Sequence, residues 1–103
     1  MNAAAKWEKI CPVEEIPVGT RKVFPLGALD ILVFNTGKRF YASNAECFLG
    51  DSLEKAELQG HVVICAAHGC KIDLANGKCI TDAGLDIPIF PVEVRDGSVW
   101  VKF

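Results

Sequence analysis

Apolar and polar residues alternate most regularly near the end of the chain. Val92-Glu93-Val94-Arg95 and Val99-Trp100-Val101-Lys102-Phe103 each place an apolar side chain at every second position. This period of two is typical of a β-strand with one buried face. Asp96-Gly97 stands between the two segments, and both residues accept the positive φ angles of a tight turn. The pattern therefore predicts a β-hairpin.

Further short segments rich in Val, Leu, Ile and Phe predict more strands, because such residues fit a half-buried pleated surface. Turns are predicted between them at Asn35-Thr36-Gly37-Lys38 and at Asn76-Gly77. The additional predicted strands are Trp7–Cys11, Lys22–Leu26, Ala28–Phe34, Arg39–Ser43, His61–Cys65 and Lys71–Leu74.

These elements predict an all-β fold, an antiparallel β-sandwich or small barrel with roughly seven to nine short strands. Only Asp51–Leu58 predicts a helix, with Asp51 as its N-cap and Glu54 placed for a capping box. The chain has 103 residues, of which 50% are hydrophobic. This length and composition are typical of one domain, which we expect to span residues 1–103.

The charge pattern argues against nucleic-acid and membrane partners. Eleven basic and thirteen acidic residues give a formal charge of −2, and no block of like charges stands out. The longest apolar run, Val62–Ala67, is far shorter than the roughly 18 residues that suggest a membrane span. Met1–Lys9 contains charged residues and no signal-like apolar stretch. We expect a cytoplasmic protein.

Cysteine is frequent in this chain, and the odd number excludes complete pairing. The five are Cys11, Cys47, Cys65, Cys70 and Cys79. In a reducing compartment such enrichment suggests metal or redox chemistry more than a disulfide framework. Free cysteine also packs in cores as a small hydrophobic residue, and both interpretations stay open for each position.

One segment combines a strand with a metal-ligand motif. Val62-Val63-Ile64 leads into Cys65-Ala66-Ala67-His68-Gly69, and a further strand then runs to the Asn76-Gly77 turn. This arrangement resembles the second cluster-binding loop of Rieske-type ferredoxins. The resemblance extends from about Trp7 to Phe103 and includes the C-terminal hairpin. It implies a Rieske-like β fold with a cluster-loop subdomain.

The resemblance also implies a cofactor and its ligands. A Rieske 2Fe-2S centre holds one iron by two thiolates and the other by two imidazoles. The family supplies them as Cys-x-His in a first loop and Cys-x-x-His in a second, which here is Cys65 and His68. In the first loop, Glu46 occupies the cysteine position and Phe48 the histidine position. A second alignment places Cys47 at the cysteine position and Leu49 at the histidine position, which shortens the loop by one residue.

The first-loop replacements remove an imidazole under either alignment. We therefore expect no ordinary two-histidine cluster, and a 2Fe-2S cluster is in doubt. If a cluster or metal binds, the resemblance implies Cys65 and His68 as ligands, with Cys47 as a third and Glu46 as a fourth. His61 stands about 13 Å from Cys65 at strand rise, too far to join them.

Other interpretations of the same residues stay open. His68 can be a loop residue of a relic site. Zinc held by Cys47, Cys65, His68 and Cys70 has suitable ligand types but an awkward geometry. Cys70 and Cys79 are expected to face each other in the core. A thiol redox site lacks the usual Cys-x-x-Cys spacing.

Two functions follow from the resemblance. The first is a Rieske-type ferredoxin-like component that transfers electrons between a reductase and a terminal oxygenase or reductase, with atypical or lost cluster ligation. The second is a cluster-free small subunit or interaction module. It is favoured by Asn76-Gly77-Lys78-Cys79, which resembles a hairpin of the small subunits of NAD(P)H nitrite reductases. We expect no catalysis by this chain alone.

The resemblance makes two spatial predictions. Glu46–Phe48 and Cys65–His68 should lie on adjacent loop tips, with Cys47 and Cys65 within about 15 Å of each other. Phe48 and Leu49 should be exposed on the first tip, where the family docks its redox partners.

Overall fold

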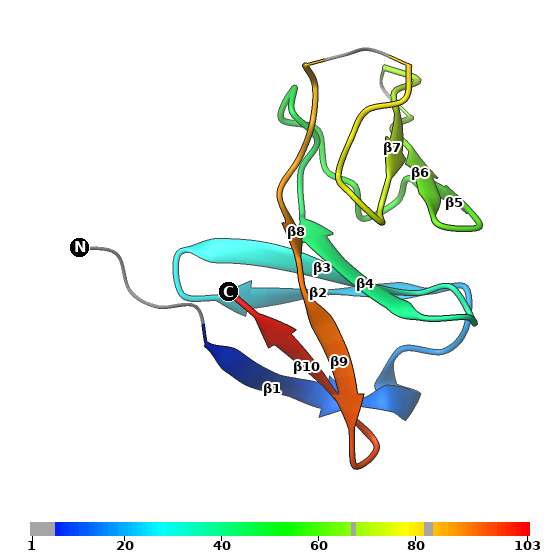
Figure 1. Ribbon diagram of the computed structural model, residues 1–103. Helices are drawn as coiled ribbons and strands as arrows, with labels where there is room; N and C mark the ends of the chain where they lie inside the picture. Colours follow the sequence, from blue (N-terminus) through cyan, green and yellow to red (C-terminus); the bar gives the residue numbers. More distant parts are fainter. Residues whose placement is uncertain (1–5, 67, 82–83) are drawn as a thin grey trace.

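The computed structural model describes residues 6–66, 68–81 and 84–103 (Figure 1). Residues 1–5, Ala67 and residues 82–83 lie outside them, and the expectations for Met1–Lys9 and Val62–Ala67 fall partly there. The described strands are β1 (Trp7–Pro12), β2 (Arg21–Leu26), β3 (Leu29–Asn35), β4 (Phe40–Asn44), β5 (Glu57–Gln59), β6 (Val62–Ile64), β7 (Lys71–Asp73), β8 (Ile89–Phe90), β9 (Val92–Arg95) and β10 (Ser98–Lys102). A 3-10 turn covers Val13–Glu15.

The central sheet has the order β2-β3-β4-β8, and all its neighbouring strands are antiparallel. Its strand β3 is buried on both faces, from Ile31 to Phe34. Because side chains alternate along a strand, Leu32 and Phe34 face one core while Ile31 and Val33 face another. The central sheet thus separates two hydrophobic cores.

The core that Ile31 and Val33 enter is closed by a sheet of order β1-β10-β9. The β9–β10 hairpin turns through Asp96 and Gly97, whose φ angles are 50° and 76°, as the Asp-Gly pair predicts. Strand β1 pairs with β10, with an irregularity between Lys9 and Cys11. Cys11 faces this core and is buried.

The core that Leu32 and Phe34 enter lies under the short sheet β5-β6-β7 (Figure 1). We call this sheet, its core and the loops at residues 45–53, 65–66 and 68–70 the tip lobe. Arg21 of β2 fastens the lobe to the central sheet. Its Nη1 donates hydrogen bonds to the carbonyl oxygens of Leu53, at 3.0 Å, and Ala56. Arg21 is partly buried, and hydrogen bonds from a charged donor are among the stronger ones, so these two bonds hold the first loop in place.

The prediction of an all-β antiparallel fold is confirmed, but the predicted helix at Asp51–Leu58 is wrong. That segment forms a bridge at Ser52, one turn that ends in a hydrogen bond from Ala56 N–H to Leu53 O, and then β5. Ser52 Oγ, not Asp51, accepts the bond from the Glu54 amide. An isolated helix this short is marginal, and burying Leu53 and Ala56 takes only one turn.

No helix in the described part of the chain is long and apolar enough to cross a bilayer.

Candidate metal centre

The first loop of the tip lobe is a tight hairpin. Glu46 and Ser52 form an antiparallel bridge, the Cys47 amide donates to Asp51 O at 2.8 Å, and the Gly50 amide donates to Cys47 O at 2.9 Å. Gly50 has a φ of 89°, a conformation that glycine adopts without strain. The hairpin turns the side chains of Cys47 and Asp51 toward the second loop.

The second loop closes in the same manner. The Cys65 amide donates to Cys70 O at 2.8 Å, and the Gly69 amide donates to Cys65 O at 2.7 Å. The positive φ of Gly69, 69°, lets the chain reverse directly after His68. Cys65 therefore points into the lobe while His68 remains near the surface.

The two loops bring thiol and imidazole groups together. The Sγ atoms of Cys47 and Cys65 lie 3.9 Å apart, and Cys65 Sγ lies 3.9 Å from His68 Nδ1. Both thiols are free and almost fully buried, at 5% and 1% exposure. The prediction of adjacent loop tips is confirmed, since the separation is far below 15 Å.

The fourth donor of this group is Asp51. One donor atom from each of Cys47, Asp51, Cys65 and His68 lies within 4.8 Å of the other three. Asp51 Oδ2 is 2.6 Å from His68 Nδ1. The sequence interpretation assigned Asp51 to a helix cap and so missed it as a candidate ligand. Its place four residues after Cys47, across a hairpin, was the available signal.

Glu46 lies outside the donor group. It is exposed, and its backbone pairs with Ser52. Neighbouring residues of an extended segment point to opposite sides, so Glu46 faces outward where Cys47 faces inward. Its role as a fourth ligand stays a prediction, and Asp51 is the carboxylate that this structure brings to the thiols.

Cys70 and Cys79 pack behind the donor group, as expected. Each is 7% exposed and belongs to the core of the tip lobe. Burial and the neighbouring Cys79 thiol raise the pKa of Cys70 above its ordinary value. Cys70 is absent from the described donor group, so the alternative zinc set of Cys47, Cys65, His68 and Cys70 differs from it by one ligand.

The second histidine, His61, lies elsewhere in the lobe. Its Nε2 is 3.4 Å from Asp73 Oδ1, and its ring lies 6.2 Å from that of Tyr41. The side chain is 52% exposed, as expected for a residue at a strand start. The described tip therefore contains a single imidazole, that of His68.

The tip surface beside the donor group is apolar. Phe48 is 60% exposed and Leu49 is 49% exposed, in the turn directly after Cys47. Exposed large apolar side chains that adjoin each other often mark contact surfaces. The predicted exposure of both residues is confirmed.

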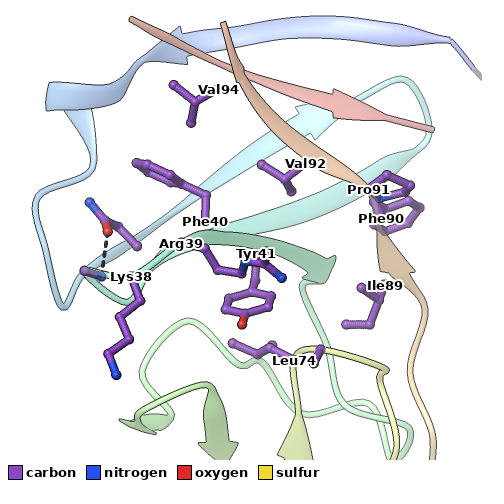
Figure 2. A pocket seen from close by; sticks show the side chains of 13 residues that line it. Lys38, Arg39, Phe40, Tyr41, Leu74, Ile89, Phe90, Pro91, Val92 and Val94 are labelled. Atoms are coloured by element: carbon purple, nitrogen blue, oxygen red, sulfur yellow. Dashed lines mark hydrogen bonds between the residues drawn. The ribbon is translucent and has the colours of Figure 1, made fainter.

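A separate hollow of about 630 Å³ lies between β4, β9 and the tip lobe. Figure 2 shows Phe40, Val92 and Val94 toward one end, and Tyr41 and Leu74 toward the other. Its described lining residues include no Cys, His, Asp or Glu. The hollow therefore offers no metal ligand of those types, and the candidate chemistry stays at the tip.

Sequence and structure comparisons find the same group of relatives. Residues 6–102 match the Rieske-like 2Fe-2S domain family. Ferredoxin CarAc of Metapseudomonas resinovorans is 33% identical over 98 residues, covering 92% of each chain. A structure of the complex of reduced oxygenase and oxidized ferredoxin in carbazole 1,9a-dioxygenase matches with a TM-score of 0.81 and 31% identity, covering 92% of this chain and 91% of that one.

A putative NADH-dependent nitrite reductase small subunit from Mycobacterium tuberculosis has a TM-score of 0.86. The match covers 98% of this chain and 97% of that one, at 17% identity. At that identity the likeness concerns the fold alone.

Proposed function

Because the chain belongs to the family of Rieske-like 2Fe-2S domains, we propose that it works as the ferredoxin-like component of a multicomponent oxygenase or reductase, and that it meets its redox partner with the tip. The family and the ferredoxin-like assignment predicted from the sequence are confirmed.

One observation carries the proposal: the exposed Phe48 and Leu49 adjoin the donor group of Cys47, Cys65 and His68. Electron transfer needs the two redox centres close together, so a carrier must present its centre to its partner. Burial of an exposed phenylalanine and leucine on association removes apolar surface from water. The same tip therefore supports both contact and proximity.

The donor group does not fit the family's ordinary cofactor. A Rieske centre binds one iron through two imidazoles, and the described tip residues supply His68 alone. His61 lies beside Asp73 and Tyr41 instead. The remaining tip donors are two thiols and a carboxylate. We therefore assign no electron-transfer step to a two-histidine cluster in this chain.

This mismatch favours a second candidate function, a cluster-free small subunit that serves as an interaction module. Phe48 or Leu49, depending on the alignment, stands at the first histidine position of the family, and both are exposed apolar residues in this chain. In either role the partner is another protein of a redox system. A reducing compartment such as the cytoplasm suits five free, buried thiols.

Cross-linking in the source cells tests the docking surface. A photo-reactive phenylalanine analogue replaces Phe48 in one variant and Val18 in a control, since Val18 is 69% exposed outside the tip. We expect the Phe48 variant alone to capture a flavin reductase, an oxygenase or a large reductase subunit, identified by mass spectrometry. Capture of no redox component, or equal capture from both positions, would refute tip docking.

Calorimetric titration with the captured component then measures the contribution of the tip. Phe48→Asp and Leu49→Asp should each weaken binding at least about tenfold, because central contacts that dominate an interface cost about 2 kcal/mol or more and about 1.4 kcal/mol is tenfold. Val18→Asp should leave the affinity unchanged, and all three variants should keep the wild-type melting temperature within a few degrees. An unchanged affinity for both tip variants would count against the proposal.

A further inference from the structure

We infer that the tip binds one divalent transition-metal ion, held tetrahedrally by Cys47, Asp51, Cys65 and His68, in place of the family's two-iron cluster. The inference deepens the proposed function by naming what the tip holds, and it rests on the same family assignment. The four residues come from the two hairpin loops, two from each.

The distances suit a single ion. Bonds of about 2.0–2.3 Å to nitrogen, oxygen and sulfur place neighbouring donors of a tetrahedral ion about 3.3–3.8 Å apart. The two Sγ atoms are separated by 3.9 Å, and Cys65 Sγ and His68 Nδ1 are also separated by 3.9 Å. No pair in the group exceeds 4.8 Å. Shifts of about 1 Å or less in the side chains complete the tetrahedron.

An unsatisfied oxygen points into the same place. Asp51 Oδ2 is buried and has no hydrogen-bond partner among the described residues, although His68 Nδ1 lies only 2.6 Å away. A buried carboxylate oxygen without a partner is costly, and each such atom requires a compensating group. A cation between the oxygen and the imidazole would compensate it and would also give Nδ1 an acceptor role.

The convergence of the four donors argues against two irons. A two-iron cluster places its bridging sulfides at the centre, and the ligands of one iron stand on the far side of them from the ligands of the other. Here the thiol of Cys65 and the imidazole of His68 lie as close as two ligands of one ion. A second imidazole is also missing from the described tip.

The donor types select the class of metal. Two thiolates and an imidazole favour zinc or iron over magnesium and calcium, which prefer oxygen ligands. Four protein ligands close the coordination sphere, as in structural zinc sites, and leave no position for a substrate. Iron in this site would give a one-electron carrier, whereas zinc would give the cluster-free subunit.

Metal binding to the full chain tests the inference. Protein purified anaerobically is assayed for metals and acid-labile sulfide, and metal-free protein is then titrated separately with Zn²⁺, Fe²⁺ and Co²⁺, the last as an optical probe of tetrahedral thiolate ligation. We expect one ion per chain, no sulfide, and a rise in melting temperature on loading. Two irons with two sulfides per chain, or no binding of any of the three ions, would overturn the inference.

Two matched pairs of variants identify the ligands. Asp51→Asn should weaken Co²⁺ binding at least about tenfold, whereas Glu46→Gln should leave it unchanged. Cys47→Ala should reduce the thiolate bands by about half, since Cys65 remains, whereas Cys70→Ala, at a thiol of the same core, should retain them in full. Circular dichroism of the metal-free variants reports whether each one is folded. Equal affinity in Asp51→Asn and the wild type would contradict the four-ligand site.

The two tests fail separately. Single-ion binding without cross-linking at Phe48 would refute the docking proposal alone. Capture of a redox partner by a chain that holds two irons and two sulfides would refute only the single-ion site.

Discussion

Cys11 is the one cysteine that lies outside the tip lobe. It packs in the core between the central sheet and β1-β10-β9, together with Val33 and Val99. Burial raises the pKa of its thiol above the ordinary 9.0, the nearby Glu15 and Glu14 raise it further, and Lys22 lowers it. Cys11 therefore contributes to the packing of this core and lies outside the candidate metal centre.

The raised pKa of Cys11 predicts a loss of stability at alkaline pH. Below pH 9 the thiol is protonated in both the folded and the unfolded state. Above pH 9 it ionises in the unfolded chain while it is still protonated in the folded protein, because its folded pKa is higher. Stability is therefore lost as pH rises from about 9 through the folded pKa. The melting temperature of the wild type should fall more between pH 8 and pH 10.5 than that of Cys11→Ala. Parallel pH profiles would contradict this, whatever the offset between the variants.

Some residues of the candidate site could be predicted from the sequence and one could not. The pairing of Cys47 with Cys65 and His68 could be predicted, because the two loops resemble those of a known family. Asp51 could not, because an aspartate before a polar segment is also a common helix cap. Only the hairpin register, in which Asp51 O accepts from the Cys47 amide, shows that its side chain joins the thiols.

At the scale of elements, alternation and turn residues predicted eight of the ten described strands to within about one residue, but not β5 and β8. Where a turn requires positive φ, as at Asp96-Gly97 and Asn76-Gly77, local sequence was enough. The helix at Asp51–Leu58 was wrongly predicted because contacts with residues distant from this segment, and not its local sequence, determine its conformation. Its backbone groups bond to Ala45 and Cys47 across the loop, and such tertiary pairing is invisible in a capping pattern.

The space around Gly77 leaves no room for a side chain. Its φ is 77°, and a Cβ atom there would lie 2.2 Å from Ile87 O and 2.8 Å from Ile89 Cγ1. Gly77→Ala should cost about 2–5 kcal/mol, from backbone strain plus a clash with backbone. Gly97→Ala has nearly the same φ, 76°, with no atom within 4 Å, and should cost only about 1–2 kcal/mol. Urea unfolding of both variants compares the losses, and equal losses would contradict the clash.

At the scale of the whole molecule, the central sheet lies between two hydrophobic cores that support different parts of the structure. The core under β1-β10-β9 serves stability, and the core under β5-β6-β7 also contains Cys47 and Cys65. Strand β3 belongs to both, because its alternate side chains enter opposite cores. The packing of β3 is therefore shared by the body of the molecule and by the lobe that contains the candidate metal centre.

This arrangement predicts that two neighbouring residues of β3 act on different parts of the molecule. Phe34→Leu and Val33→Ala each leave a cavity at a fully buried position, and each should cost about 1–3 kcal/mol. Phe34 faces the core of the tip lobe and Val33 faces the other core. Hydrogen exchange should therefore accelerate at the Cys47 and Cys65 amides in Phe34→Leu, relative to the amides of β10, and the reverse should hold for Val33→Ala. The ratio between the two sets of amides within each variant cancels the shared loss of global stability. An identical ratio in both variants would show that the two cores open together, and the separation of tasks across the central sheet would then be wrong.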